Sequence, residues 1–148
     1  MSAYATLIEA EAFVLANIMD STDWDAAADA LKEKGLLLAT NMIDNLNFIG
    51  EKTVAAQAQQ FPRGEDTVVP TNIKEACTHI AMRLVEGIDM ELELENVFMT
   101  AQQYGNVRSV YNRDVVAEHI IHGIPSMQAW LKLKPYLREI GTVDISRV

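Results

Sequence analysis

Apolar residues between positions 73 and 88 recur with the period of an α-helix. They fall 0, 3, 4, 7, 8, 11, 12 and 15 positions after the first of them, which places all of them on one helical face. These residues are Ile73, Ala76, Cys77, Ile80, Ala81, Leu84, Val85 and Ile88. The pattern predicts a long amphipathic helix, with Thr71 or Asn72 as its N-cap, that must bury this face against another element. The chain is therefore expected to fold as a packed helical protein.

Two earlier segments show the same period. Thr6 and Glu9 have the spacing of a capping box, which predicts the start of a first helix. A second long helix is expected from about Asp29, after a short helical turn at residues 24–28. Its apolar stripe comprises Leu31, Gly35, Leu38, Ala39, Met42, Ile43 and Leu46. Gly35 costs about 1 kcal/mol relative to alanine inside a helix, so we expect it to mark a close contact with a neighbouring helix.

The middle of the chain is less regular. Residues 51–70 form a predicted polar loop, broken at Pro62. Residues 90–95 alternate with period two, yet we prefer a helix that continues from the preceding one. Residues 104–111 hold β-branched and aromatic side chains around a Gly-Asn pair, which favours an extended arm or a hairpin.

A last helix is expected to begin after Ser126 and to be interrupted at Pro135. The predicted fold is mainly α: a small bundle of about four helices with an extended arm or hairpin and a C-terminal tail. We predict a single domain over residues 1–148. Its parts are a helical body (residues 1–99), an extended arm (residues 100–122), and the last helix with the tail (residues 123–148).

Large apolar residues supply the candidate core. We expect it to contain Trp24, Leu38, Ile43, Phe48, Phe61, Ile80, Ala81 and Leu84. The longest apolar run, residues 35–39, is far shorter than the roughly 18 residues of a membrane span. The first residues lack the basic and apolar regions of a secretion signal, and the single cysteine, Cys77, excludes an internal disulfide. These features predict a protein of a reducing cytoplasm without membrane contact.

Acidic and basic side chains are unevenly distributed. Residues 1–100 hold 17 acidic and six basic side chains, whereas residues 101–148 hold four and six, within a net charge of −9. Affinity for nucleic acid comes from clustered Lys and Arg, so this balance argues against a nucleic-acid-binding body. It is typical either of a solvated acidic surface or of a protein whose basic tail reaches a different partner.

Side chains with catalytic or metal-binding potential are scattered. Glu118, His119 and His122 form the best metal-like cluster, but two imidazoles rarely make a site without a third ligand, and His79 is distant in sequence. Cys77 lies on an apolar stripe, where we expect a small hydrophobe and not a reactive thiol. An acidic run lacks the geometry of a calcium loop. It comprises Glu86, Asp89, Glu91, Glu93 and Glu95.

Known catalytic and cofactor-binding motifs are missing from the sequence. It holds no phosphate-binding loop, dinucleotide-binding, nucleophile-elbow or zinc-protease motif. We therefore predict no catalytic residues, no metal and no cofactor.

One ordered set of residues resembles a known family. The set comprises Trp24, Lys32, Leu36, Ala39, Thr40, Ile43, Asp44, Phe48, Gly50, Gln57, Phe61, Pro62, Arg63, Val69 and Pro70, followed by Ile73, Lys74 and Ala76. It resembles the small head-tail connector, or adaptor, proteins of tailed bacteriophages, which are also catalogued as head completion proteins. Some sequences with this pattern are labelled DnaT-like single-stranded-DNA-binding proteins.

The resemblance implies a structural virion protein that forms a ring of twelve copies between the portal protein and a tail or nozzle protein. Such a ring extends the DNA ejection channel and completes the head after packaging, and DNA passes through it without specific binding. The protein would lie in the host cytoplasm before assembly. We expect subunit or portal contacts at Arg63, Tyr104, Arg108, Tyr111, Arg113, Trp130, Tyr136, Arg138, Arg147 and Val148.

A DnaT-like single-stranded-DNA-binding protein is the alternative interpretation. It needs a basic groove with aromatic stacking platforms, and the net charge of the chain opposes it. The residues that approach this requirement are Tyr104, Arg108, Tyr111 and Arg113. For Arg63 the sequence leaves two options, contact with its own chain or with a neighbouring subunit. We expect an isolated monomer whose arm and tail become ordered on assembly.

Overall fold

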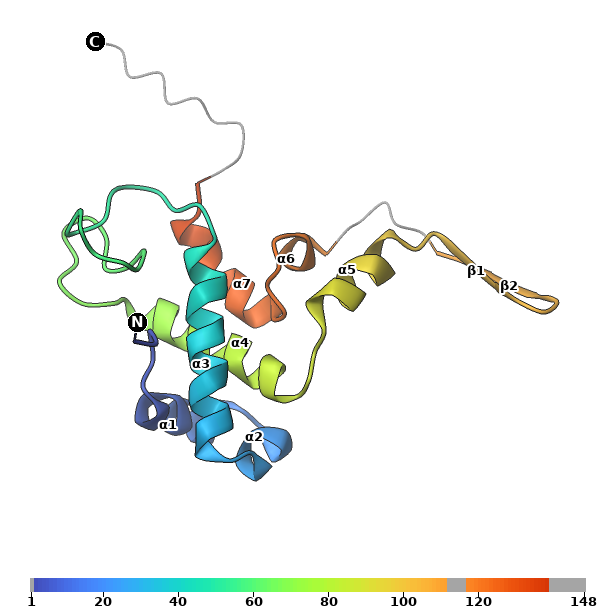
Figure 1. Cartoon of the computed structure of the whole chain (residues 1–148), viewed down its shortest axis with the longest axis horizontal. Helices are drawn as coiled ribbons and strands as arrows, with labels where there is room; N and C mark the ends of the chain where they lie inside the picture. The colour runs from blue at the N-terminus through green and yellow to red at the C-terminus, as the bar shows by residue number, and fades with distance from the viewer. Residues whose placement is uncertain (1, 112–116, 139–148) are drawn as a thin grey trace, which may run out of the picture.

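The computed structural model describes residues 2–111 and 117–138. Over these residues the protein has seven α-helices and one two-stranded hairpin, which confirms the mainly α fold class (Figure 1). The helices are α1 (Leu7–Asn17), α2 (Thr22–Ala26), α3 (Asp29–Asp44), α4 (Thr71–Val85), α5 (Met90–Phe98), α6 (Glu118–Ile121) and α7 (Met127–Leu133). A 3₁₀ turn, η1 (Lys134–Tyr136), follows α7, and the strands are β1 (Ala101–Tyr104) and β2 (Val107–Val110). No helix in the described ranges is long and apolar enough to cross a membrane.

Helix α4 is the centre of the body and packs against α3 on one side and α7 on another. Figure 1 shows α3 crossing α4, with α1 and α2 at one end of this pair. A Cβ atom at Gly35 would lie 3.4 Å from the Ala81 carbonyl oxygen and 3.5 Å from Val85 Cγ2. The predicted close helix contact at Gly35 is therefore confirmed, because a side chain there would press α3 away from α4.

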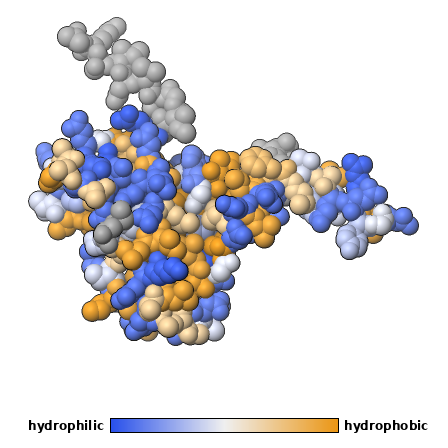
Figure 2. Space-filling model, viewed as in Figure 1, coloured by the Kyte–Doolittle hydropathy of each residue, from blue (hydrophilic) through white to orange (hydrophobic). Residues whose placement is uncertain are grey.

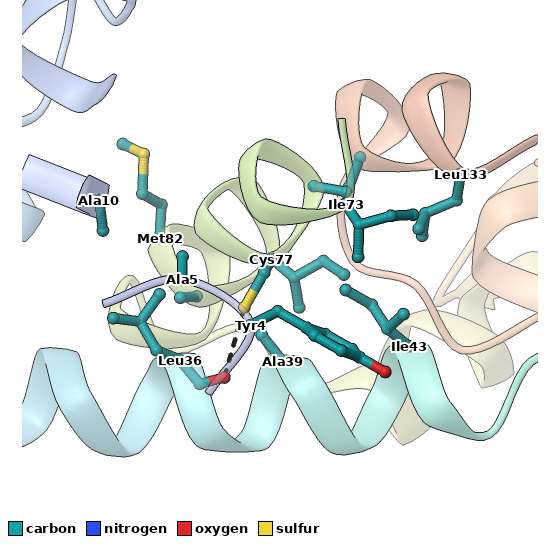
Figure 3. Close-up of a cluster of buried hydrophobic side chains, with 14 of the residues drawn as sticks. Tyr4, Ala5, Ala10, Leu36, Ala39, Ile43, Ile73, Cys77, Met82 and Leu133 are labelled. Atoms are coloured by element: carbon teal, nitrogen blue, oxygen red, sulfur yellow. Dashed lines mark hydrogen bonds between the residues drawn. The ribbon is translucent and has the colours of Figure 1, made fainter. Parts of the chain in front are cut away.

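The core contains large residues from every part of the body (Figure 3). Among the expected core residues, those that are buried are Trp24, Ile43, Phe48, Phe61, Ile80 and Ala81. Leu38 was a wrong assignment, since its side chain is 44% exposed. Leu84 is half-buried at the edge of the core.

Helix α3 buries a face about one residue away from the predicted stripe. Its buried positions are Lys32, Gly35, Leu36, Ala39, Thr40 and Ile43. Two polar side chains on this face have partners inside the protein. Lys32 Nζ lies 3.0 Å from Glu11 Oε1 and over the Trp24 ring, and Thr40 Oγ1 accepts a hydrogen bond from the Tyr4 amide at 3.0 Å. Because these partners come from distant segments, hydrophobicity alone placed the face wrongly.

Helix ends follow local sequence signals in part. Thr6 and Glu9 form the predicted capping box, and Ser126 Oγ accepts from the Ala129 amide at the start of α7 as expected. Helix α4 differs, because Pro70 and not Thr71 or Asn72 occupies the N-cap position.

Residues 90–95 are helical as predicted, but they do not continue α4. The chain turns at Gly87, whose φ of 87° is unfavourable for residues with a Cβ atom. Helix α5 then begins anew with Asp89 as its cap, and the Asp89 carboxylate accepts from the Glu91 amide at 3.0 Å.

The arm is the part of the molecule that extends from the body (Figure 1). In the structure, the arm comprises α5 and the antiparallel β1–β2 hairpin, so it includes a helix that was predicted to belong to the body. The hairpin pairs Tyr104 with Val107 across a turn at Gly105 and Asn106. Of the predicted extended arm or hairpin, a hairpin is therefore found. Residues 118–121 also fell within the predicted arm, yet they form α6.

An aromatic cluster joins the segment before α1 and the 3₁₀ turn η1 to the loop between α3 and α4. The Phe61 ring meets Tyr4, Phe48 and Tyr136 edge-on, with ring centroids 5.9, 4.8 and 5.7 Å away. The Ile49 amide donates to the Tyr136 carbonyl oxygen at 2.9 Å, beside the cluster. The segment after α7 is thus fixed to the end of α3, and this connection shapes the surface described next.

Candidate nucleic-acid interface

Acidic side chains are nearly missing between residues 96 and 138. This acid-poor segment holds Asp114 and Glu118 as its acidic residues. Its basic residues are Arg108, Arg113, Lys132, Lys134 and Arg138. The average charge of the chain therefore hides a region of opposite sign, in which a polyanion meets less repulsion.

The hairpin carries two tyrosines on one face. Tyr104 lies opposite Val107, and Tyr111 has the same strand parity as Val107, so the three side chains share one face. The Tyr111 hydroxyl is 3.5 Å from Gln102 Oε1 on the same face. Tyr104 is 88% exposed, and every side chain of β1 and β2 is exposed. We call Tyr104, Val107 and Tyr111 the tyrosine face.

Arg108 lies on the opposite face of the hairpin, in register with Gln103. Tyr111 lies four positions after Val107, the partner of Tyr104, which sets the two tyrosines about 13 Å apart along the ribbon. Figure 2 shows that hydrophilic residues predominate toward the tip of the hairpin and apolar residues on the α5 part of the arm. The ribbon therefore offers two aromatic rings, amide side chains and a cation, and its strands contain no carboxylate.

A groove of about 1140 Å³ lies between the end of α3, α6 and α7. We call it the α7 groove. Its polar and charged lining includes Asn45, Asn47, Glu118, His122, Lys134 and Arg138. The His122 imidazole stacks on the Trp130 indole, with ring centroids 4.9 Å apart and planes inclined by 13°. Trp130 is buried and His122 is exposed, so the outer ring of the stack is available to a ligand.

Glu118 is the acidic residue of the α7 groove and accepts two hydrogen bonds there. Its carboxylate accepts from Lys134 Nζ at 3.1 Å and from the Trp130 indole N–H at 3.2 Å. These hydrogen bonds lower the pKa of Glu118. Arg138 forms no ion pair within the described parts of the chain, and its backbone amide donates to the Asn47 carbonyl oxygen at 3.0 Å. Arg138 thus lines the groove without an ion pair to any carboxylate of residues 2–111 and 117–138.

Several residues that were expected to contact another subunit or the portal instead contact their own chain. Trp130 is buried, and Tyr136 packs on Phe61. Arg63 contacts its own chain: Nε donates to the Ile49 carbonyl oxygen at 3.0 Å, and Nη1 donates to Gln60 Oε1 at 2.8 Å. It also donates to the Gly50 carbonyl oxygen. Arg113, Arg147 and Val148 lie outside the described residues.

Metal-binding and thiol chemistry find little support in the geometry. Glu118 accepts hydrogen bonds from Lys134 and Trp130, while His122 stacks on Trp130, so these side chains of the metal-like cluster weighed from the sequence are engaged elsewhere. Within residues 2–111 and 117–138 no three His, Cys, Asp or Glu side chains are placed to share a metal ion. Cys77 is buried, and burial raises the pKa of its thiol.

Comparison with known proteins identifies the family of this chain. Residues 1–147 match the family model described as "Putative DnaT-like ssDNA binding protein". The chain belongs to this family. Searches of curated proteins and of solved structures find no match to it. Membership of this family corrects the interpretation drawn from the phage resemblance, because the matched family is described by single-stranded-DNA binding. The predicted portal-binding ring, with its virion and connector roles, is wrong. The prediction that DNA passes without specific binding is wrong as well.

Sequence reasoning missed the amide side chains of Asn45 and Asn47, and it named His122 and Trp130 without predicting that they stack on each other. Asn45 and Asn47 follow α3, whereas the other two lie more than 70 residues later. No local signal connects them, since only the tertiary fold brings them to one groove. The tyrosines and Arg108 were recognised, but their distribution over two hairpin faces required the strand register.

Proposed function

We propose that this protein binds single-stranded DNA with the tyrosine face and the α7 groove. Membership of the DnaT-like family over residues 1–147 is the observation that carries the proposal. The tyrosine face and the part of the α7 groove formed by α6, α7 and η1 belong to the acid-poor segment, which supports their use for a polyanion. The chain's non-enzymatic nature remains a prediction.

Stacking provides most of the affinity in this proposal. Unpaired bases stack on exposed aromatic rings for about 1–3 kcal/mol per base, and the contact tolerates any sequence. Tyr104 offers such a ring on the arm, and His122 offers one in the groove. Duplex DNA keeps its bases stacked on one another, so the protein should prefer single strands.

Phosphate contacts contribute less, because the protein offers few suitable cations. Lys134 and Arg138 line the α7 groove, and Arg108 lies on the hairpin face opposite the tyrosine face. Three phosphate contacts on a single strand give a slope of about −2 in a plot of log K against log salt concentration. Weak electrostatics combined with stacking corresponds to moderate affinity with shallow salt dependence.

A fluorescence anisotropy titration tests the proposal. A labelled oligothymidylate and a duplex of the same length are titrated with the full chain between 50 and 200 mM salt. We expect saturable binding of the single strand, weaker binding of the duplex and the shallow slope given above. Absence of binding at 50 mM salt, or equal affinity for the duplex, would contradict the proposal.

A further inference from the structure

A second hollow lies on another side of α7. It is an open hollow lined by α1, α4, α7 and the residues after α1, and it has a volume of about 370 Å³. We call it the α1–α4–α7 pocket. Its lining includes Phe13, Asn17, Glu75, His79, Gln128 and Lys132. Pockets of 300 to 1,000 Å³ are typical of small-ligand sites, so this volume suits a group about the size of a nucleoside.

Aromatic and neutral hydrogen-bonding groups meet in the pocket. The His79 and Phe13 rings are in edge-to-face contact, with centroids 5.2 Å apart. Burial and then the nearby Lys132 charge lower the pKa of His79, so its imidazole is neutral at pH 7. A neutral imidazole has one donor and one acceptor nitrogen, and the amides of Asn17 and Gln128 also offer both kinds of group.

The charged residues of the pocket neutralise each other. Lys132 Nζ donates to Glu75 Oε2 across α7 and α4. With its single lysine engaged in this way and its histidine neutral, the pocket offers a phosphate group no unpaired cation. Its lining instead matches a planar, uncharged molecule that carries both donors and acceptors, and the unpaired bases of nucleic acid have this chemistry.

Helix α7 separates this pocket from the α7 groove. Gln128 and Lys132 line the pocket, whereas Leu131 and Lys134 line the groove. A helix is about 10–12 Å across with its side chains, so a short stretch of single strand can contact both sides. Lys132 and Lys134 stand along that path.

From this placement we infer that the α1–α4–α7 pocket accepts one unstacked base of a single strand that also lies in the α7 groove. The inference rests on the proposed function. It assigns His79, Gln128 and Asn17 to a base-binding site that is separate in space from the tyrosine face. The phosphates on either side of that base remain outside the pocket, near α7.

The test replaces the hydrogen-bonding groups of the pocket and keeps their volume. Gln128→Leu alters an exposed residue, and His79→Leu alters a half-buried one. Asn41→Leu is the matched control, because Asn41 is an exposed amide on α3 that lines neither surface. Each full-length variant is titrated with an oligonucleotide that contains 2-aminopurine, whose fluorescence rises when the base leaves the stack. Thermal unfolding establishes that each variant is folded.

The expected result is a loss of about fivefold in affinity for each pocket variant, corresponding to one lost hydrogen bond, with a smaller fluorescence rise and no change for Asn41→Leu. Normal binding and a normal fluorescence rise in folded Gln128→Leu would overturn the base pocket while leaving single-strand binding intact. Failure of the unaltered protein to bind any single strand would overturn the proposed function and the pocket together. The two failures are therefore distinguishable.

Discussion

The helical body and the arm place their apolar side chains in opposite ways. In the body, rings and aliphatic chains from α1 to α4 and from α7 form one buried cluster. In the arm, neither α5 nor the hairpin buries a residue, and Phe98 and Tyr104 remain exposed.

This difference predicts that the body determines the stability of the fold and that the arm affects binding. A two-stranded hairpin alone is marginally stable in water, so the arm contributes little to holding the fold together. Its exposed rings are the ones to which the proposed function assigns base stacking. Substitutions in the body should therefore change the free energy of unfolding, and substitutions on the arm should change affinity.

The strongest test compares one substitution in both regions. Phe61→Ala removes the ring that meets Tyr4, Phe48 and Tyr136, and we expect it to lower the free energy of unfolding by about 3–5 kcal/mol. Phe98→Ala removes a ring that is 66% exposed on α5, and we expect a change within about 0.5 kcal/mol. Urea unfolding followed by circular dichroism measures both. Equal losses would show that the arm is part of the stabilising core.

The converse test concerns affinity. Tyr104→Ala should weaken binding of an oligothymidylate by about 1–3 kcal/mol, because one stacked base is lost. Val110→Ala changes an exposed residue on the other face of the hairpin and should leave affinity unchanged. Anisotropy titrations measure both variants. Equal weakening by the two would mean that the face of the hairpin does not matter.

A smaller effect is expected at the start of α1. Thr6→Ala removes the capping side chain and should destabilise the body by about 1 kcal/mol. Thr71→Ala is the control, since Thr71 follows the Pro70 cap of α4 and caps nothing. Urea midpoints give the comparison, and a matching loss in the control would argue against a specific capping effect.

The smallest effect is a pH dependence. The hydrogen bonds from Lys74 and from the Thr6 amide lower the pKa of Glu9 below its usual 4.5. The folded state therefore holds the Glu9 proton less tightly than the unfolded state. The stability that Glu9 contributes is present above pH 4.5 and is lost as the pH falls through the lowered pKa. Because the pair is partly exposed, this contribution should stay below about 1 kcal/mol.

Urea unfolding at pH 6 and at successively lower pH values measures this contribution. Glu9→Gln should be less stable than the unaltered protein at pH 6, and the two should converge in acid. A difference that persists at the lowest pH would assign the effect to packing instead of charge.

Local signals predicted some elements well. The stripe from Ile73 to Ala81, the capping box at Thr6 and the Ser126 cap each depend on residues within one or two helical turns. The face of α3 could not be predicted in this way, because Lys32 and Thr40 are buried through Glu11 and Tyr4, which lie on another segment.

The candidate interface was predictable in part for a related reason. The tyrosines and Arg108 are close in sequence, so composition indicated them. Asn47 reaches the α7 groove through the backbone hydrogen bond between its carbonyl oxygen and the Arg138 amide, a contact across more than 90 residues. The total charge of −9, which was used as an argument against nucleic-acid binding, does not describe the candidate interface, because it averages an acidic body with the acid-poor segment.

The aromatic cluster around Phe61 has a consequence for synthesis. Its members Tyr4 and Tyr136 are 132 positions apart. The ribosome must therefore synthesise the chain as far as residue 136 before the last ring can pack against Phe61. Long-range contacts of this kind form late in folding. A nascent chain that stops before residue 136 leaves one side of Phe61 uncovered, and the exposed ring gives quality-control proteases and chaperones a means to distinguish unfinished copies from finished ones.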